Sequence, residues 1–136
     1  MAAWLRYLTA FVVFAHGFIY VRIGSVLPGP ITVWQGKSWL LGDGFSGEQL
    51  RLLVVSLHVG AGVAILASAL AIAFAPSKNG WWRPLAITGA AAGLVAFTVF
   101  WDGQTRAMFE EGLIGALASL SLLIGAVAFA DAFSQP

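Results

Sequence analysis

The sequence predicts an all-α integral membrane protein, a bundle of four transmembrane helices forming one domain over residues 1–136. Hydrophobic residues make up 60% of the chain and charged residues 10%, whereas soluble domains average about 45–50% and about 25%. The few charges also leave four long runs without any charge. A soluble domain of this length could not bury so much apolar surface, and lipid removes the need to bury it.

The uncharged runs set the expected positions of the helices. A helix that crosses a bilayer needs about 20 apolar residues. The first run, 7–21, is long enough if Arg6 and Arg22 extend their charged heads to the membrane surface. Because a backbone in lipid has to satisfy its own hydrogen bonds, each run should be helical. We expect helices at about 4–26, 47–75, 82–101 and 107–131.

Proline, serine and tryptophan mark the connections. The run Leu27-Pro28-Gly29-Pro30 should end the first helix, since proline cannot continue the hydrogen-bond ladder. The run Ser46-Gly47-Glu48-Gln49 predicts a capping box that opens the second helix. Between them, Trp34 and Trp39 predict a Trp-rich loop that lies at the membrane interface, with a lid over a cavity in the bundle as the alternative.

Charge limits the partners and suggests an orientation. The net charge of +1 is too small to predict a nucleic-acid partner. The absence of cysteine excludes disulfides and thiolate metal sites. Arg6, Lys78 and Arg83 lie in short segments on one side of the membrane. The positive-inside rule therefore predicts that both termini are cytoplasmic.

Glycines predict where helices approach one another. Gly89 and Gly93 form a GxxxG pattern on the third predicted helix. Small residues of this kind let two helix backbones come close. The pattern predicts packing within the bundle or, alternatively, a docking face for other membrane subunits or a second copy of the chain. The further candidates for such faces are Gly60, Gly62, Gly112 and Gly115.

Two histidines lie inside the predicted spans, and an ionisable group in a membrane is a functional hypothesis. His16 precedes Arg22 by six residues, and His58 follows Arg51 by seven. In antiparallel helices both imidazoles would lie at a similar depth, roughly 9–11 Å below the same face. They could form hydrogen bonds within the bundle, line a pocket for a quinone or another lipophilic ligand, or ligate haem b. With no further ligands nearby, a closed metal site is not expected.

Charged residues border this histidine layer on the same side of the membrane. Arg22 and Arg51 flank it, and Glu110 and Glu111 precede the fourth predicted helix. The two acids would suit the positive N-terminal dipole of that helix. Alternatively, one of them is a proton acceptor at the mouth of a pocket. The candidate ligand-binding residues are therefore His16, His58, Arg22, Arg51, Glu110, Glu111, Trp34 and Trp39.

The first helix resembles that of the DoxX-like four-helix membrane family, which carries an Arg near its start, an apolar run and a His-Gly pair. Arg6, His16 and Gly17 match this order. Tyr20 stands at about the place of that family's Lys, and His58 stands where its second helix often has a Glu. The resemblance implies a four-helix membrane protein, and some family members are membrane subunits of quinone-linked oxidoreductases.

These features favour a small non-catalytic membrane subunit that docks to and stabilises or anchors a larger complex, with a role related to electron transfer. The alternative is a quinone-, lipid- or haem-binding protein that uses His16 and His58. A transporter or channel is a third class, which would have to oligomerise to form a pore. It is disfavoured because the spans hold no internal proline break and no charged pathway. No catalytic arrangement of Ser, His and Asp is present.

Overall fold

Four α-helices account for most of the described chain. The computed structural model describes residues 3–25, 38–74, 80–101 and 112–128. The elements are α1 (Ala3–Ser25), a short 3-10 helix η1 (Gly42–Gly44), α2 (Gly47–Phe74), α3 (Trp82–Phe100) and α4 (Leu113–Ala128). The described residues contain no strand, which confirms the all-α fold class.

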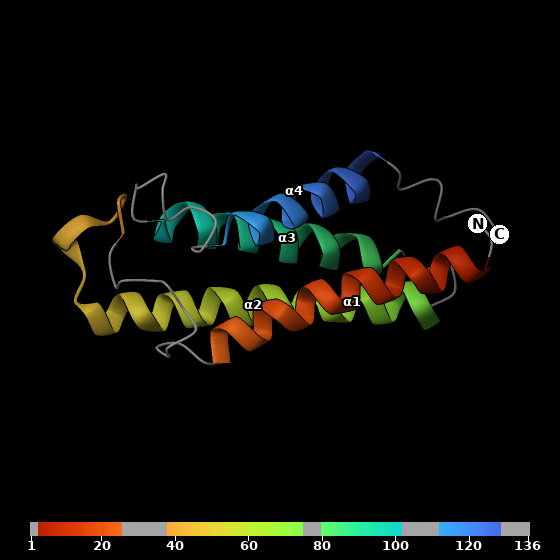
Figure 1. Ribbon diagram of the computed structural model, residues 1–136, viewed down its shortest axis with the longest axis horizontal. Coiled ribbons are helices and arrows are strands. Elements are labelled where there is room, and N and C mark those ends of the chain that lie inside the picture. Colours follow the sequence, from red (N-terminus) through yellow and green to blue (C-terminus); the bar gives the residue numbers. More distant parts are fainter. Residues whose placement is uncertain (1–2, 26–37, 75–79, 102–111, 129–136) are drawn as a thin grey trace.

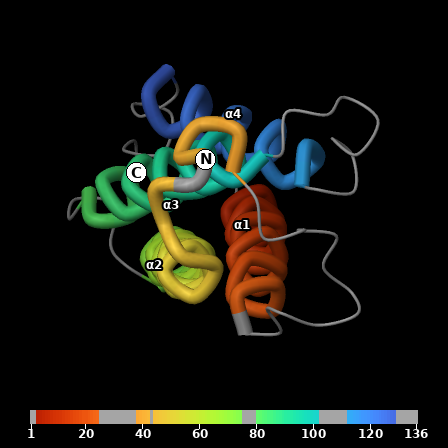
Figure 2. The backbone as a smooth tube through the Cα atoms, turned by 90° about the vertical axis from the view of Figure 1, so that its left-hand side faces the viewer, coloured from red at the N-terminus to blue at the C-terminus, as the bar shows by residue number. Residues whose placement is uncertain are grey.

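Successive helices run antiparallel along one long axis, as Figure 1 shows. The start of α1 and the end of α4 therefore lie at the same end of the bundle. The end view in Figure 2 places α1 beside α2, with α3 and α4 covering them. Neighbours in sequence pack on each other, whereas α1 and α4 touch only slightly. The contact between α1 and α4 is thus much smaller than the contacts between helices that follow one another in the sequence.

Three of the helices are long and apolar enough to cross a membrane, namely α1, α2 and α3. The described part of α4 is also apolar but has 16 residues, or about 24 Å of helix against about 30 Å of hydrocarbon. Large apolar side chains such as Phe11, Phe18, Ile114 and Ile124 point outward. The chain is therefore an integral multi-pass membrane protein, and its outer surface is suited to lipid.

Close contact between backbones holds α1, α2 and α3 together. A Cβ atom built on Gly62 would lie 2.8 Å from the carbonyl oxygen of Gly17 and 2.7 Å from the backbone nitrogen of Val21. A Cβ atom on Gly89 would lie 2.9 Å from the carbonyl oxygen of Ala61. Both glycines thus face a neighbouring helix of the same chain. The backbone of α2 therefore lies in close contact with both α1 and α3.

The start of α2 has the expected capping box. The Ser46 amide donates to Gln49 Oε1 at 3.0 Å, and the Gln49 amide donates to Ser46 Oγ at 3.3 Å. These reciprocal bonds satisfy amide groups that have no partner within the helix. The predicted capping box is confirmed, and it explains why α2 begins at Gly47.

The segment before α2 folds over the C-terminal end of α3. Ser38 Oγ donates to the Val99 carbonyl, and Trp39 Nε1 donates to the Thr98 carbonyl. The Trp39 amide donates to the Trp101 carbonyl at 3.0 Å. The last carbonyls of a helix have no partner within it, so this segment supplies the missing donors. Trp39 is half exposed and is fixed at one end of the bundle.

Candidate functional site

A hydrogen bond between α1 and α4 holds His16. Its Nε2 lies 3.1 Å from Ser119 Oγ, and Ser119 is fully buried. A buried hydroxyl needs a hydrogen-bond partner, and apolar surroundings offer few. This contact is one of the few that join α1 to α4. The imidazole therefore ties together two helices that have few other contacts.

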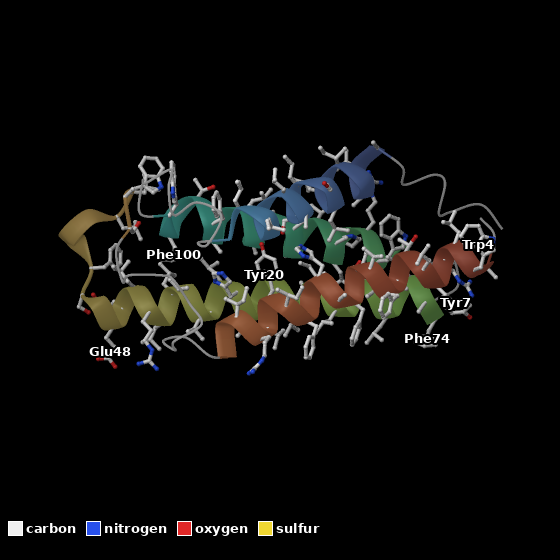
Figure 3. The ribbon with its side chains drawn as sticks, in the orientation of Figure 1. Trp4, Tyr7, Tyr20, Glu48, Phe74 and Phe100 are labelled. Atoms are coloured by element: carbon white, nitrogen blue, oxygen red, sulfur yellow. The ribbon has the colours of Figure 1, made fainter. Side chains whose placement is uncertain are left out.

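Tyr20 lies one helical turn beyond His16 and reaches the same serine. Its hydroxyl lies 3.0 Å from Ser119 Oγ, and only 4% of its surface is exposed. Positions separated by four residues lie on one face of a helix, so His16 and Tyr20 point the same way. Their rings meet edge to face with centroids 5.1 Å apart. Figure 3 shows Tyr20 at mid-bundle, between Trp4 and Phe74 at one end and Phe100 at the other.

His58 approaches the same tyrosine from α2. Its ring centroid lies 5.6 Å from that of Tyr20. Its Nδ1 lies 2.9 Å from the Val54 carbonyl oxygen, and because a carbonyl only accepts, Nδ1 is the donor. The Tyr20 ring contacts both imidazoles, and no hydrogen bond joins the two histidines within the described chain. We call His16, Tyr20, His58 and Ser119 the polar layer.

Glycines make room for the polar layer on α3 and α4. A Cβ atom on Gly93 would lie 2.7 Å from the Tyr20 hydroxyl and 2.9 Å from Ser119 Oγ. A Cβ atom on Gly115 would lie 3.6 Å from the same hydroxyl. At Gly93 a larger residue would occupy the space in which the two hydroxyls meet. The absence of a side chain there allows the hydrogen bond to form.

The polar layer offers hydrogen-bond donors without a fixed charge. His16, Ser119 and Tyr20 share two contacts. If His16 carries its proton on Nε2, three protons serve these two contacts, and one donor is left to bind another acceptor. If the proton is on Nδ1, both hydroxyl protons are used in the two contacts, and the remaining donor is the Nδ1–H of the imidazole. The site carries no fixed charge, and the identity of its free donor depends on where His16 holds its proton. Such a site suits a small anion or another strong hydrogen-bond acceptor.

The other candidate residues are spread over the molecule. Arg22 and Arg51 are exposed, and Trp39 lies at the end of α3. Trp34, Glu110 and Glu111 lie outside the described residues.

The candidate packing glycines also differ in their surroundings. Gly62, Gly89 and Gly93 face other helices of the chain, whereas Gly60 faces open space. Gly112 has a φ of 112°, a conformation that glycine adopts readily, just before α4 begins. Among the described residues no group of three His, Cys, Asp or Glu side chains could hold a metal ion.

Sequence reasoning found the two histidines but missed Ser119 and underestimated Tyr20. Tyr20 entered only as the residue at the place of a lysine. One signal could have found it, because it follows His16 by one helical turn on the same face. Ser119 is separated from His16 by 103 positions. No local pattern marks it, so its role depends on how α4 is rotated in the bundle.

A curated relative identifies the family. The chain is 38% identical over 103 residues to the fluoride-specific ion channel FluC of Pseudomonas syringae pv. maculicola, and the match covers 69% of this chain and 76% of that protein. The chain belongs to the FluC family. No family model matches the sequence, and no solved structure matches it.

FluC membership corrects two interpretations of the sequence. The resemblance to the DoxX-like family is wrong, since the identity to FluC extends far beyond three matched residues. Those residues have local explanations in this fold. His16 bonds Ser119, and Gly17 is close to the backbone of α2, where its Cβ would lie 2.9 Å from the Leu66 nitrogen.

The preferred function was wrong as well. A non-catalytic docking or anchoring subunit, its electron-transfer role and the quinone- or haem-binding alternative do not agree with a family of ion channels. The class that sequence analysis ranked third, a transporter or channel, is the one that the relative supports. Lack of a charged pathway misled the ranking, because neutral donors such as those of Tyr20 and Ser119 can also line an ion path.

Proposed function

We propose that this protein conducts fluoride across the membrane and that the ion passes the polar layer between α1 and α4. The relative is named as a fluoride-specific channel. The observation that carries the location is the shared contact of His16 and Tyr20 with Ser119. Fluoride is a small anion that accepts hydrogen bonds strongly. Hydroxyl and imidazole donors in an apolar bundle can replace part of its hydration shell.

The position between α1 and α4 follows from the packing. The contacts of Gly17 with α2 and of Gly89 with Ala61 bring the backbones of α1 and α2, and of α2 and α3, close together. The first and last helices touch slightly, and polar groups gather between them. An ion could pass there with little displacement of the backbone.

We also propose that the conducting unit contains more than one copy of the chain. A single bundle presents lipid with few polar groups along its described outer surface. A second copy would exclude lipid from the polar layer and complete the path. Chemical cross-linking in native membranes tests this. Dimers or larger species are expected, and a monomer that conducts fluoride would contradict it.

Orientation can be tested because the chain lacks cysteine. We propose that the start of α1 and the end of α4 face the cytoplasm, as the positive residues predict. A single cysteine introduced at Arg83, beside the start of α3, should then resist membrane-impermeant maleimide in intact cells. Labelling without lysis would place this end outside.

Fluoride efflux from liposomes tests the function directly. Purified protein is reconstituted into vesicles loaded with potassium fluoride, and valinomycin compensates the charge. A fluoride-selective electrode should record rapid efflux, whereas vesicles loaded with potassium chloride should retain chloride. Efflux no faster than that of protein-free vesicles would exclude fluoride conduction.

A matched pair of variants on α4 tests the location. Ser119→Ala removes the hydroxyl shared by His16 and Tyr20. Ser121→Ala removes an exposed hydroxyl that bonds the Leu117 carbonyl of its own helix. A hydrogen bond to a charged group contributes about 1.5–3 kcal/mol, so Ser119→Ala should slow fluoride efflux roughly ten- to hundredfold. Ser121→Ala should conduct normally. Equal rates in the two variants would move the path away from the polar layer.

A further inference from the structure

The backbone of α2 determines which nitrogen of neutral His58 carries the proton. Because Nδ1 donates to the Val54 carbonyl, the proton of the neutral ring is on Nδ1. The other nitrogen, Nε2, then presents a lone pair. It has no hydrogen-bond partner among the described residues and is not fully buried. Neutral His58 therefore presents an acceptor beside the Tyr20 ring.

An acceptor repels fluoride, which is itself only an acceptor. A second proton on the imidazole turns Nε2 into a donor and gives the ring a positive charge. A charged donor forms a hydrogen bond to an anion about twice as strong as a neutral one does. One proton on His58 therefore changes Nε2 from a group that repels an anion to one that attracts it.

The helices provide no carboxylate to balance a charged His58. On α1, the Tyr20 ring contacts His58, His16 lies beyond that ring, and the exposed Arg22 lies two residues after Tyr20. On α2 itself, Glu48 lies ten residues away and is exposed, a distance of about 15 Å along the helix. Arg51 is exposed on the same helix.

The other two helices contribute no acid either. The described part of α3 carries Arg83 at the opposite end of the bundle, and that of α4 carries no charged residue. An imidazolium without a counterion is costly in an apolar bundle. Among the described groups nothing but a bound anion could neutralise it.

We propose that fluoride and a proton on His58 occupy the polar layer together, so that fluoride passage is regulated by pH. This inference rests on the proposed function. Each ion lowers the cost of placing the other in the bundle, and the linkage is reciprocal. The proton stays on the imidazole while fluoride moves past it. No covalent bond forms or breaks.

The pH dependence of fluoride efflux tests the linkage. Efflux of the wild type should rise as pH falls from 8 towards 5, with a limit of about tenfold per pH unit for a single titrating group. Efflux from protein-free vesicles, measured at each pH, is subtracted to remove the leak of hydrogen fluoride. A wild-type rate that does not change over this range would overturn the linkage and leave the proposed function standing.

Two substitutions separate the roles of the two ring nitrogens. His58→Asn keeps an amide near the position of Nδ1, where it can still donate to the Val54 carbonyl, but it has no group at Nε2. His58→Gln places an amide donor near Nε2 that does not titrate. We expect slow efflux at every pH for His58→Asn, and efflux independent of pH for His58→Gln. A wild-type pH profile in either variant would assign the titration to another group.

Proton uptake in detergent tests the linkage without transport. Adding sodium fluoride to the wild type in a weakly buffered solution near neutral pH should remove up to one proton per chain from the medium. His58→Asn should remove none, and sodium chloride is the control. Wild-type uptake equal to that of His58→Asn overturns the linkage, whether or not efflux is seen. Absence of wild-type efflux at every pH contradicts the proposed function instead.

Discussion

Gly62→Ala should separate α1 from α2, and its neighbour Gly60 supplies the control. The new methyl group would lie 2.7 Å from the backbone nitrogen of Val21 and 2.8 Å from the carbonyl oxygen of Gly17. Ordinary contact begins at 3.4 Å. The helices must therefore move apart by about 0.6–0.7 Å, because a backbone cannot rotate out of the way as a side chain can. A gap of roughly 0.5–1 Å forfeits a quarter to a half of the dispersion energy of each contact.

Overpacking of this kind costs about 1–3 kcal/mol, and contact with backbone atoms places Gly62→Ala in the upper half of that range. Gly60→Ala adds the same methyl group two residues away, where nothing lies within 4 Å. Since alanine favours a helix more than glycine does, Gly60→Ala should be neutral or slightly stabilising. Unfolding in mixed micelles with increasing dodecyl sulfate, followed by circular dichroism, gives both free energies. Equal values for the two variants would refute the close approach of α1 and α2.

Three further changes test the local structure by the same unfolding assay. Gln49→Ala breaks the capping box and should cost about 1 kcal/mol, whereas an unchanged free energy would mean that the Ser46 hydroxyl caps α2 alone. Trp39→Phe keeps the ring but loses the bond to the end of α3, and should cost about 0.5–1.5 kcal/mol; no loss would show that the contact is not maintained in micelles. Ser68 is fully buried and donates to the Trp82 carbonyl at the start of α3 at 2.8 Å, so Ser68→Ala should cost about 0.5–1.5 kcal/mol by removing this hydrogen bond. A neutral result would show that water replaces the hydroxyl.

The fold was predictable because lipid simplifies the physics. Once a segment is long, apolar and uncharged, a helix is the one structure that satisfies its backbone in a membrane. Charged residues such as Arg22 and the cap at Ser46 then limit where the helices end. The expected first helix, 4–26, and the described α1, Ala3–Ser25, differ by one residue at each end. The predicted orientation and the single-domain organisation stay predictions.

The polar layer was predictable only in part. Histidines are conspicuous in an apolar span, and antiparallel helices place His16 and His58 at a similar depth. The contact of Ser119 with His16 depends on the rotation of α4, and an apolar helix shows little periodicity from which that rotation could be read. The family was misjudged for a related reason. Positions such as Gly17 satisfy packing needs that recur in many membrane bundles.

The reversal potential of a planar bilayer tests the central claim most directly. The wild type is reconstituted between solutions of potassium fluoride at a tenfold concentration ratio, near pH 6. If fluoride carries the current, the potential should approach about 59 mV with the sign of an anion. Replacing fluoride by chloride on both sides should abolish the current. A potential near zero, or one that is the same in chloride, would contradict fluoride conduction by this protein.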